Sequence, residues 1–138
     1  MKIEINENEE ELKKALNKIF IEDDRKNKID PKFLAFAFSI KDDKNNILGG
    51  VRGWRIFNDI YVDELAVDKN IRRQGYGKKL LEMVEQKIND GFCDNINLVT
   101  NEFQEAIDFY KKCGFKIDFV RYNSKNEKSN KYYMVKKL

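Results

Sequence analysis

The stretch that decides the fold reads Tyr61-Val-Asp-Glu-Leu-Ala-Val67, then Asp-Lys-Asn-Ile71, then Arg72-Arg-Gln-Gly75-Tyr-Gly77-Lys-Lys-Leu-Leu81. It predicts an apolar strand, a short basic loop with two glycines, and an amphipathic helix. Glycines at the start of a helix let the backbone approach a ligand closely. The free N–H groups and the dipole of that helix end attract an anion, and pyrophosphate is a common ligand there.

Other phosphate-binding loops fit this stretch poorly. A P-loop needs Ser or Thr after Gly-Lys, but Lys79 follows Gly77 and Lys78. A dinucleotide-binding fingerprint needs a third glycine three residues after Gly77, where Leu80 stands. On this motif alone, an alternative is that Gly75 and Gly77 only shape a strand-to-helix turn.

The rest of the chain supplies elements on both sides of this stretch. Apolar runs and alternation predict strands at 2–6, 33–40, 47–57, 60–67, 96–100, 115–121 and 132–137. Helical spacing predicts amphipathic helices that carry Leu12 to Phe20, Leu80 to Ile88 and Ala106 to Tyr110. This order predicts an α/β (α+β) protein: one domain over residues 1–138, with a mixed, mostly antiparallel sheet and helices on both faces.

The composition excludes several kinds of chemistry. The 138 residues include no His, which excludes a Ser-His-Asp triad, a Cys-His pair and a His-containing zinc site. Cys93 and Cys113 are too few for a thiolate cluster or a disulfide scaffold. We therefore expect no metal.

The charge pattern bears on partners and location. The 27 Lys and Arg stand against 24 Asp and Glu, a net charge of only +3 with both signs mixed along the chain, so we expect no nucleic-acid partner. The N-terminus is acidic, and the longest apolar run, residues 33–40, is far shorter than the roughly 20 residues of a membrane span. These features predict a cytoplasmic protein with no membrane partner.

Three motifs in order resemble a known family. Arg72-x-x-Gly75-x-Gly77 resembles the Arg/Gln-x-x-Gly-x-Gly/Ala motif of the GNAT superfamily of N-acetyltransferases. Glu64-Leu-Ala-Val67 is similar to the family's strand just upstream of that loop. The run from Ala106 to Phe115 resembles its Ala-x-x-Phe/Leu-Tyr-x-x-x-Gly-Phe helix end. Together the motifs cover roughly residues 60–115.

This resemblance implies a GNAT-like fold and an activity. The expected enzyme transfers an acetyl group from acetyl-CoA, a cosubstrate, to a primary amine by direct attack in a ternary complex. A small-molecule amine is favoured over a protein amine, and a homodimer is an option. The cofactor is expected to enter where the parallel strands 60–67 and 96–101 splay apart. The alternative is a non-catalytic sensor or structural module that binds an acyl-CoA.

The resemblance also implies roles for individual residues. The backbone of Leu65, Ala66 and Val67 would pair with the pantetheine arm, and Tyr110 would approach the cofactor sulfur. One position departs from the family: Phe103 stands where many members carry Asn, and Asn101 is the nearby candidate for that contact. The pyrophosphate would be bound by the loop and helix start, with added charge from the two arginines: Arg72, Arg73, Gln74, Gly75, Tyr76, Gly77 and Lys78.

The proton transfers point to two candidate catalytic residues, Glu64 and Tyr110. A lysine-like amine has a pKa near 10.4, so a base must accept its proton, and without His the choices are Glu64 or Asp63, directly or through water. Strand alternation predicts that these two lie on opposite faces, and the resemblance favours Glu64. Tyr110 stays protonated at neutral pH and would donate to the leaving thiolate. The alternatives are a solvated or salt-bridged Glu64 and a core Tyr110, while Cys113 is interpreted as helix packing.

Overall fold

The computed structural model describes residues 1–5 and 7–138. The chain divides into two compact units, residues 1–31 and residues 32–138, which are described separately.

The first unit is built around one helix, α1 (Glu9–Lys26). Asn8 caps it as expected, because its side-chain oxygen accepts a hydrogen bond from the Glu11 amide at 3.1 Å. Acidic residues fill the first turn and basic residues the last, which suits the helix dipole. Residues 1–5 form no strand, so the strand expected there is wrong for them, since a short alternating run needs a pairing partner. Asn6 lies outside the described residues.

The second unit contains a six-stranded sheet in the order β1-β2-β3-β4-β6-β5. Only β3 and β4 pair in parallel, so the sheet is mixed and mostly antiparallel, as the sequence predicts. The sequence predicts helices on both faces of the sheet; helix α1 belongs to the other unit and is described separately. The elements of the second unit are β1 (Leu34–Lys41), β2 (Ile47–Ile56), β3 (Asp59–Val67), α2 (Tyr76–Ile88), β4 (Asn95–Asn101), α3 (Ile107–Lys112), β5 (Lys116–Arg121) and β6 (Lys131–Lys137).

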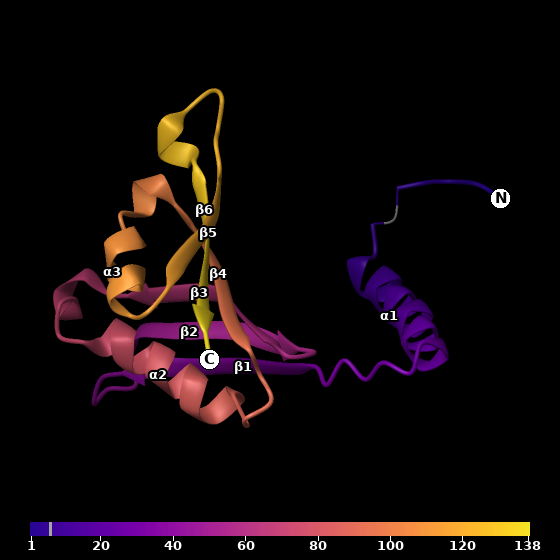
Figure 1. Cartoon of the computed structure of the whole chain (residues 1–138), viewed down its shortest axis with the longest axis horizontal. Coiled ribbons are helices and arrows are strands. Elements are labelled where there is room, and N and C mark those ends of the chain that lie inside the picture. Colours follow the sequence, from indigo (N-terminus) through magenta and orange to yellow (C-terminus); the bar gives the residue numbers. More distant parts are fainter. Residues whose placement is uncertain (6) are drawn as a thin grey trace. The chain divides into compact units, whose positions relative to one another are not determined.

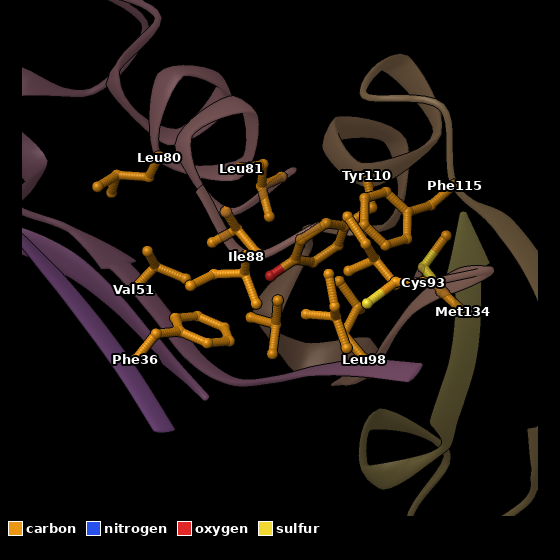
Figure 2. Close-up of a cluster of buried hydrophobic side chains, with 14 residues drawn as sticks. Phe36, Val51, Leu80, Leu81, Ile88, Cys93, Leu98, Tyr110, Phe115 and Met134 are labelled. Carbon is orange, nitrogen blue, oxygen red and sulfur yellow. The ribbon is translucent and has the colours of Figure 1, made fainter. Parts of the chain in front are cut away.

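The core lies between the sheet and helices α2 and α3. Helix α2 buries residues at the spacing that its sequence predicts: Leu80, Leu81, Val84 and Ile88. Figure 2 shows Leu80, Leu81 and Ile88 facing Val51 and Leu98 of the sheet, with the Tyr110 ring among these side chains and Phe115 toward one end of the cluster. Burial of each such side chain stabilises the fold by about 1.5–3 kcal/mol. None of the described helices combines the length and the apolar character that crossing a membrane requires.

Strands β3 and β4 separate soon after they meet. Their parallel pairing covers only Asp59 to Tyr61 against Asn95 to Asn97, although both strands continue further. At the paired end, one oxygen of Asp59 accepts hydrogen bonds from the side-chain amides of Asn95 and Asn97 at 3.0 and 3.1 Å. Figure 1 shows that β5 and β6 run in a clearly different direction from β1–β3. The expected splaying of these two strands is confirmed, and we call the opening the fork.

A β-bulge interrupts the pairing of β3 with β2. Arg52 lies opposite Glu64, but Gly53 lies opposite Val62, so Asp63 is the extra residue. Gly53 is buried at this point, and a Cβ there would lie 1.9 Å from the carbonyl oxygen of Tyr61. The expectation that Asp63 and Glu64 lie on opposite faces is therefore wrong, because the bulge breaks the alternation on which it depended.

Candidate active site

A cavity of about 770 Å³ opens at the fork. Its walls come from the end of β3, the loop that follows, the first turn of α2, and the segment from the end of β4 into α3. Gln74, Asn101 and Glu64 do not line it. The structure brings the other predicted site residues together in its lining: Leu65, Ala66, Val67, Arg72, Arg73, Gly75, Tyr76, Gly77, Lys78 and Tyr110.

The first turn of α2 presents unpaired amides to this cavity. The first hydrogen bond of the helix runs from the Lys79 amide to the Gly75 carbonyl at 3.0 Å, and no side chain caps the N-terminus within the described residues. The amides of Tyr76, Gly77 and Lys78 thus have no acceptor in the helix. Gly75 has φ +84°, a conformation that favours glycine, and a Cβ there would meet no atom within 4 Å. This arrangement suits an anion.

Basic side chains add positive charge around these amides. Arg73 and Lys78 are exposed and line the cavity. Arg72 also lines it, but its Nε donates a hydrogen bond to the carbonyl of Val67 at 2.8 Å. Arg72 therefore ties the loop to the end of β3, a structural role that the sequence analysis did not foresee.

Tyr110 lies at the wall of the cavity with only 8% of its surface exposed. Its ring packs against Phe109 and Phe115, with centroids 5.1 and 5.7 Å away, as Figure 2 shows for Phe115. Burial, together with the nearby Cys113, raises the pKa of Tyr110 to about 12, so its hydroxyl is protonated at neutral pH. No hydrogen-bond partner of this hydroxyl is found among the described residues. It is therefore able to donate a proton to a ligand.

The two cysteines, Cys93 and Cys113, do not line the cavity, although Cys113 lies near Tyr110. Burial raises the pKa of the Cys113 thiol and of the Cys93 thiol above their ordinary value. A protonated thiol is a poor nucleophile, which agrees with the interpretation of both side chains as packing. Across residues 1–5 and 7–138 there is no cluster of three or more Cys, Asp or Glu side chains able to hold a metal ion.

The wall opposite β3 contains residues that the sequence analysis missed. A short 3₁₀ turn, Glu102–Gln104, follows β4, and Phe103, Gln104 and Glu105 line the cavity. Gln104 accepts hydrogen bonds from the Asn101 amide at 2.8 Å and the Thr100 hydroxyl at 3.2 Å. The three-residue spacing of Asn101 and Gln104 in the sequence is that of a capping box, and the structure forms this box at the start of the 3₁₀ turn, before α3 begins.

A second hollow, which we call the groove, adjoins the cavity. It has a volume of about 740 Å³, is lined by β1, β2 and the end of β3, and contains Glu64. It shares Ala66, Val67 and Arg72 with the cavity, so the two hollows meet at the end of β3. Glu64 thus borders the fork from the groove rather than from the cavity.

Arg52 holds both candidate bases of β3. One of its terminal nitrogens lies 3.0 Å from an oxygen of Glu64 and 2.9 Å from an oxygen of Asp63. The hydrogen bond from Arg52, followed by its charge, holds the pKa of Glu64 below its ordinary value. Glu64 is therefore ionised at neutral pH but is a weaker base than a free glutamate.

Comparison with known proteins places this geometry in a family. Residues 35–117 match the model of the acetyltransferase (GNAT) domain. Over 65 residues the chain is 34% identical to peptidyl-lysine N-acetyltransferase YjaB of Salmonella typhimurium, which is 47% of this chain and 42% of that protein. The chain spans less than half the length of the curated relatives it matches.

Solved structures share the fold across the chain. An acetyltransferase from Bacillus cereus superposes with a TM-score of 0.80 at 27% identity, covering 100% of this chain and 99% of that one. A GNAT family acetyltransferase from Elizabethkingia anophelis, solved with acetyl-CoA bound, has the same fold, with a TM-score of 0.64 at 21% identity over 75% of this chain and 76% of its own. The family model alone covers more than half of the 138 residues. The chain belongs to the GNAT family of acetyltransferases.

Proposed function

We propose that this protein is an N-acetyltransferase that transfers the acetyl group of acetyl-CoA to a small primary amine, by direct attack in a ternary complex. The observation that carries the proposal is the cavity at the fork. It combines an unpaired strand edge, an uncapped helix N-terminus and a protonated tyrosine. The family membership and the acetyl-CoA bound to a relative of the same fold support the choice of ligand.

The residues present fit such a ligand. Beyond Tyr61 the side of β3 that faces the fork has no strand partner, so the backbone of Leu65 to Val67 is available to pair with an amide-containing chain. The open space in front of Gly75 and the unpaired amides of the first helical turn suit a diphosphate. Arg73 and Lys78 would add charge beside it. When bound, the thioester supplies an activated acyl carbon.

Two residues would transfer protons in the reaction. The Tyr110 hydroxyl, with its raised pKa, would donate to the leaving sulfur. The amine would enter through the groove, where Glu64, ionised by its contact with Arg52, accepts its proton directly or through a water. Asp63 shares the same Arg52 nitrogen and is the second candidate base. The shared lining at Ala66 and Val67 would bring the amine and the thioester together.

A second candidate function is a module that binds an acyl-CoA without turning it over. One observation favours it: the Glu64 carboxylate lies outside the cavity and is already paired with Arg52. A paired carboxylate of lowered pKa is a weaker base, which is consistent with a protein that binds but does not catalyse.

Calorimetry followed by a thiol-release assay tests both candidates. We expect heat of binding with acetyl-CoA, and release of free coenzyme A that depends on an added amine from a panel of polyamines, amino sugars, amino acids and lysine-containing peptides. Binding with no release on any amine would favour the binding module. Release only with peptides would overturn the preference for a small molecule, and absence of binding would overturn the proposed function.

A further inference from the structure

Glu102, in the turn that forms one wall of the cavity, is held by a neighbouring loop. One oxygen of its carboxylate accepts a hydrogen bond from the Tyr132 hydroxyl at 2.6 Å and a longer one from the Asn130 side-chain amide at 3.4 Å. Its backbone amide donates to the carbonyl of Asn130 at 2.9 Å. Three hydrogen bonds therefore join this residue to the end of the β5–β6 loop and the start of β6.

The β5–β6 loop is itself built from asparagine contacts. Buried Asn130 accepts from the amide of Asn123 at 2.8 Å, and Asn123 in turn accepts from the amides of Lys125 and Asn126. Side chains of this type hold a turn without strand pairing. The loop thus ends in a buried residue, Asn130, that also contacts Glu102.

The hydrogen bonds of Glu102 bear on the cavity because the turn that carries Glu102 continues into the cavity wall. Phe103, Gln104 and Glu105 follow directly and line the cavity. Glu105 has φ +53°, a conformation that costs a non-glycine residue about 1 kcal/mol or more, so the surrounding contacts must hold this turn in place. The contacts of Glu102 with Asn130 and Tyr132 are placed to do so.

We propose that Glu102 is a positioning residue: through Tyr132 and Asn130 it clamps the 102–105 wall of the cavity to the β5–β6 loop, and this clamp sets the affinity for acetyl-CoA rather than the rate of acetyl transfer. The proposal rests on the proposed function, because it assumes that acetyl-CoA occupies the cavity. No atom of the clamp lines the cavity, so its effect on the ligand is indirect.

The test measures acetyl-CoA binding by calorimetry in the full chain, together with KM and kcat. Because hydrogen bonds to a charged group are strong, Glu102→Ala should weaken binding roughly tenfold and Tyr132→Phe roughly threefold, while kcat at saturating acetyl-CoA changes less than about twofold. The double variant should be no weaker than Glu102→Ala alone, because both changes break one contact. Glu102→Gln keeps an acceptor oxygen and should restore most of the affinity.

A matched control and a spectroscopic readout separate positioning from general stability. Glu127→Ala removes an exposed carboxylate from the same loop and should leave binding unchanged. The hydrogen bond that the Tyr132 hydroxyl donates to the Glu102 carboxylate raises the pKa of Tyr132, so ultraviolet titration should show one tyrosine shifting to lower pH in Glu102→Gln. If Glu102→Ala fails to fold, the affinity of Tyr132→Phe for acetyl-CoA decides the outcome.

Two results overturn the inference in distinguishable ways. If wild-type protein binds acetyl-CoA and Glu102→Ala and Tyr132→Phe both bind within twofold of it, the clamp has no role and the proposed function stands. A fall in kcat in these variants with unchanged affinity for acetyl-CoA would also overturn the inference and leave the proposed function standing. If wild-type protein gives no heat with acetyl-CoA, the proposed function and the inference fail together.

Discussion

The two sides of strand β3 behave differently. Toward β2 the strand is paired along nearly its whole length, from Asp59 to Val67, with one bulge. Toward β4 it is paired only from Asp59 to Tyr61, and the rest of that side faces the cavity. One strand is thus paired along one side and left with an open edge at the cavity along most of the other.

The closed and open ends of the fork have different side chains. At the closed end the Asp59 carboxylate holds Asn95 and Asn97 of the neighbouring strand. At the open end Leu65 to Val67 have no strand partner on the side toward β4, and Arg72 donates a hydrogen bond to the Val67 carbonyl from the following loop. An exposed strand edge invites aggregation unless something covers it, so a ligand edge is best kept short and bordered by charge. The following changes test this difference between the two sides.

The largest expected effect comes from filling the open side. Gly75→Glu places a bulky anion where no atom lies within 4 Å and where a diphosphate is expected, so acetyl-CoA binding should fall by about a thousandfold or more. Calorimetry measures this affinity for acetyl-CoA. Gly75→Ala is the control, because it adds the same backbone strain at φ +84° without charge or bulk. Normal affinity in Gly75→Glu would contradict the assignment of the diphosphate site.

A change on the paired side should affect stability first. In Gly53→Ala the new Cβ would lie 1.9 Å from the Tyr61 carbonyl, so the bulge must shift, and the free energy of unfolding should fall by about 2 kcal/mol. Urea denaturation measures this. Gly91→Ala, at φ +86° with no atom within 4 Å, is the control for a glycine outside the sheet and should cost about 1 kcal/mol. Equal losses of unfolding free energy in Gly53→Ala and Gly91→Ala would mean that the close approach of Gly53 to the Tyr61 carbonyl is unimportant for stability.

Removing the Tyr110 hydroxyl should lower turnover. Tyr110→Phe keeps the ring packed on Phe115 but removes the proposed proton donor, so kcat should fall ten- to a hundredfold while the affinity for acetyl-CoA stays within about twofold. Tyr133→Phe is the control: that ring stacks on Phe119 and lies outside the cavity lining. An unchanged kcat in Tyr110→Phe would rule out Tyr110 as the donor.

The same tyrosine gives the smallest expected effect, a pH dependence of stability. Its pKa is about 12 in the folded protein and about 10 when unfolded, so only the unfolded state ionises in between. The stability that the neutral hydroxyl provides is complete below pH 10 and is lost as the pH rises toward 12. At pH 11 the loss should be about 1.4 kcal/mol.

Denaturation at pH 9 and pH 11 in wild type and Tyr110→Phe isolates this contribution from the other tyrosines. The wild-type protein should lose about 1.4 kcal/mol more than the variant. Identical pH dependence of the two proteins would mean that Tyr110 is not buried in solution.

Much of the fold could be predicted because its signals are local. The strand and helix bounds follow apolar spacing, and Asn8 caps α1 as its spacing from Glu11 indicates. The predictions are wrong where the pairing of strands overrides the local sequence pattern. Alternation placed Asp63 and Glu64 on opposite faces, but the bulge opposite Gly53 brings both to Arg52. The capping-box spacing of Asn101 and Gln104 is confirmed, but the helix that it begins is a 3₁₀ turn and not α3.

For the candidate site, the loop and helix start were predictable and the far wall was not. The glycines and basic residues after Val67 form one continuous stretch, so their placement around the uncapped start of α2 follows from the geometry of a single helix end. Phe103 to Glu105 carry no motif of their own, and only the folded chain brings them opposite β3.

The sequence by itself determined the order of the elements from the first helix onward, the glycine-rich and basic start of α2, and the membership of residues 35–117 in a family. These are properties of neighbouring residues, which share a strand, a turn or a helix. Tertiary structure alone decided where β3 and β4 part, that Glu64 faces the groove while Tyr110 faces the cavity, and that Glu102 meets Tyr132. Those depend on contacts between residues far apart in the chain, which local propensity does not encode.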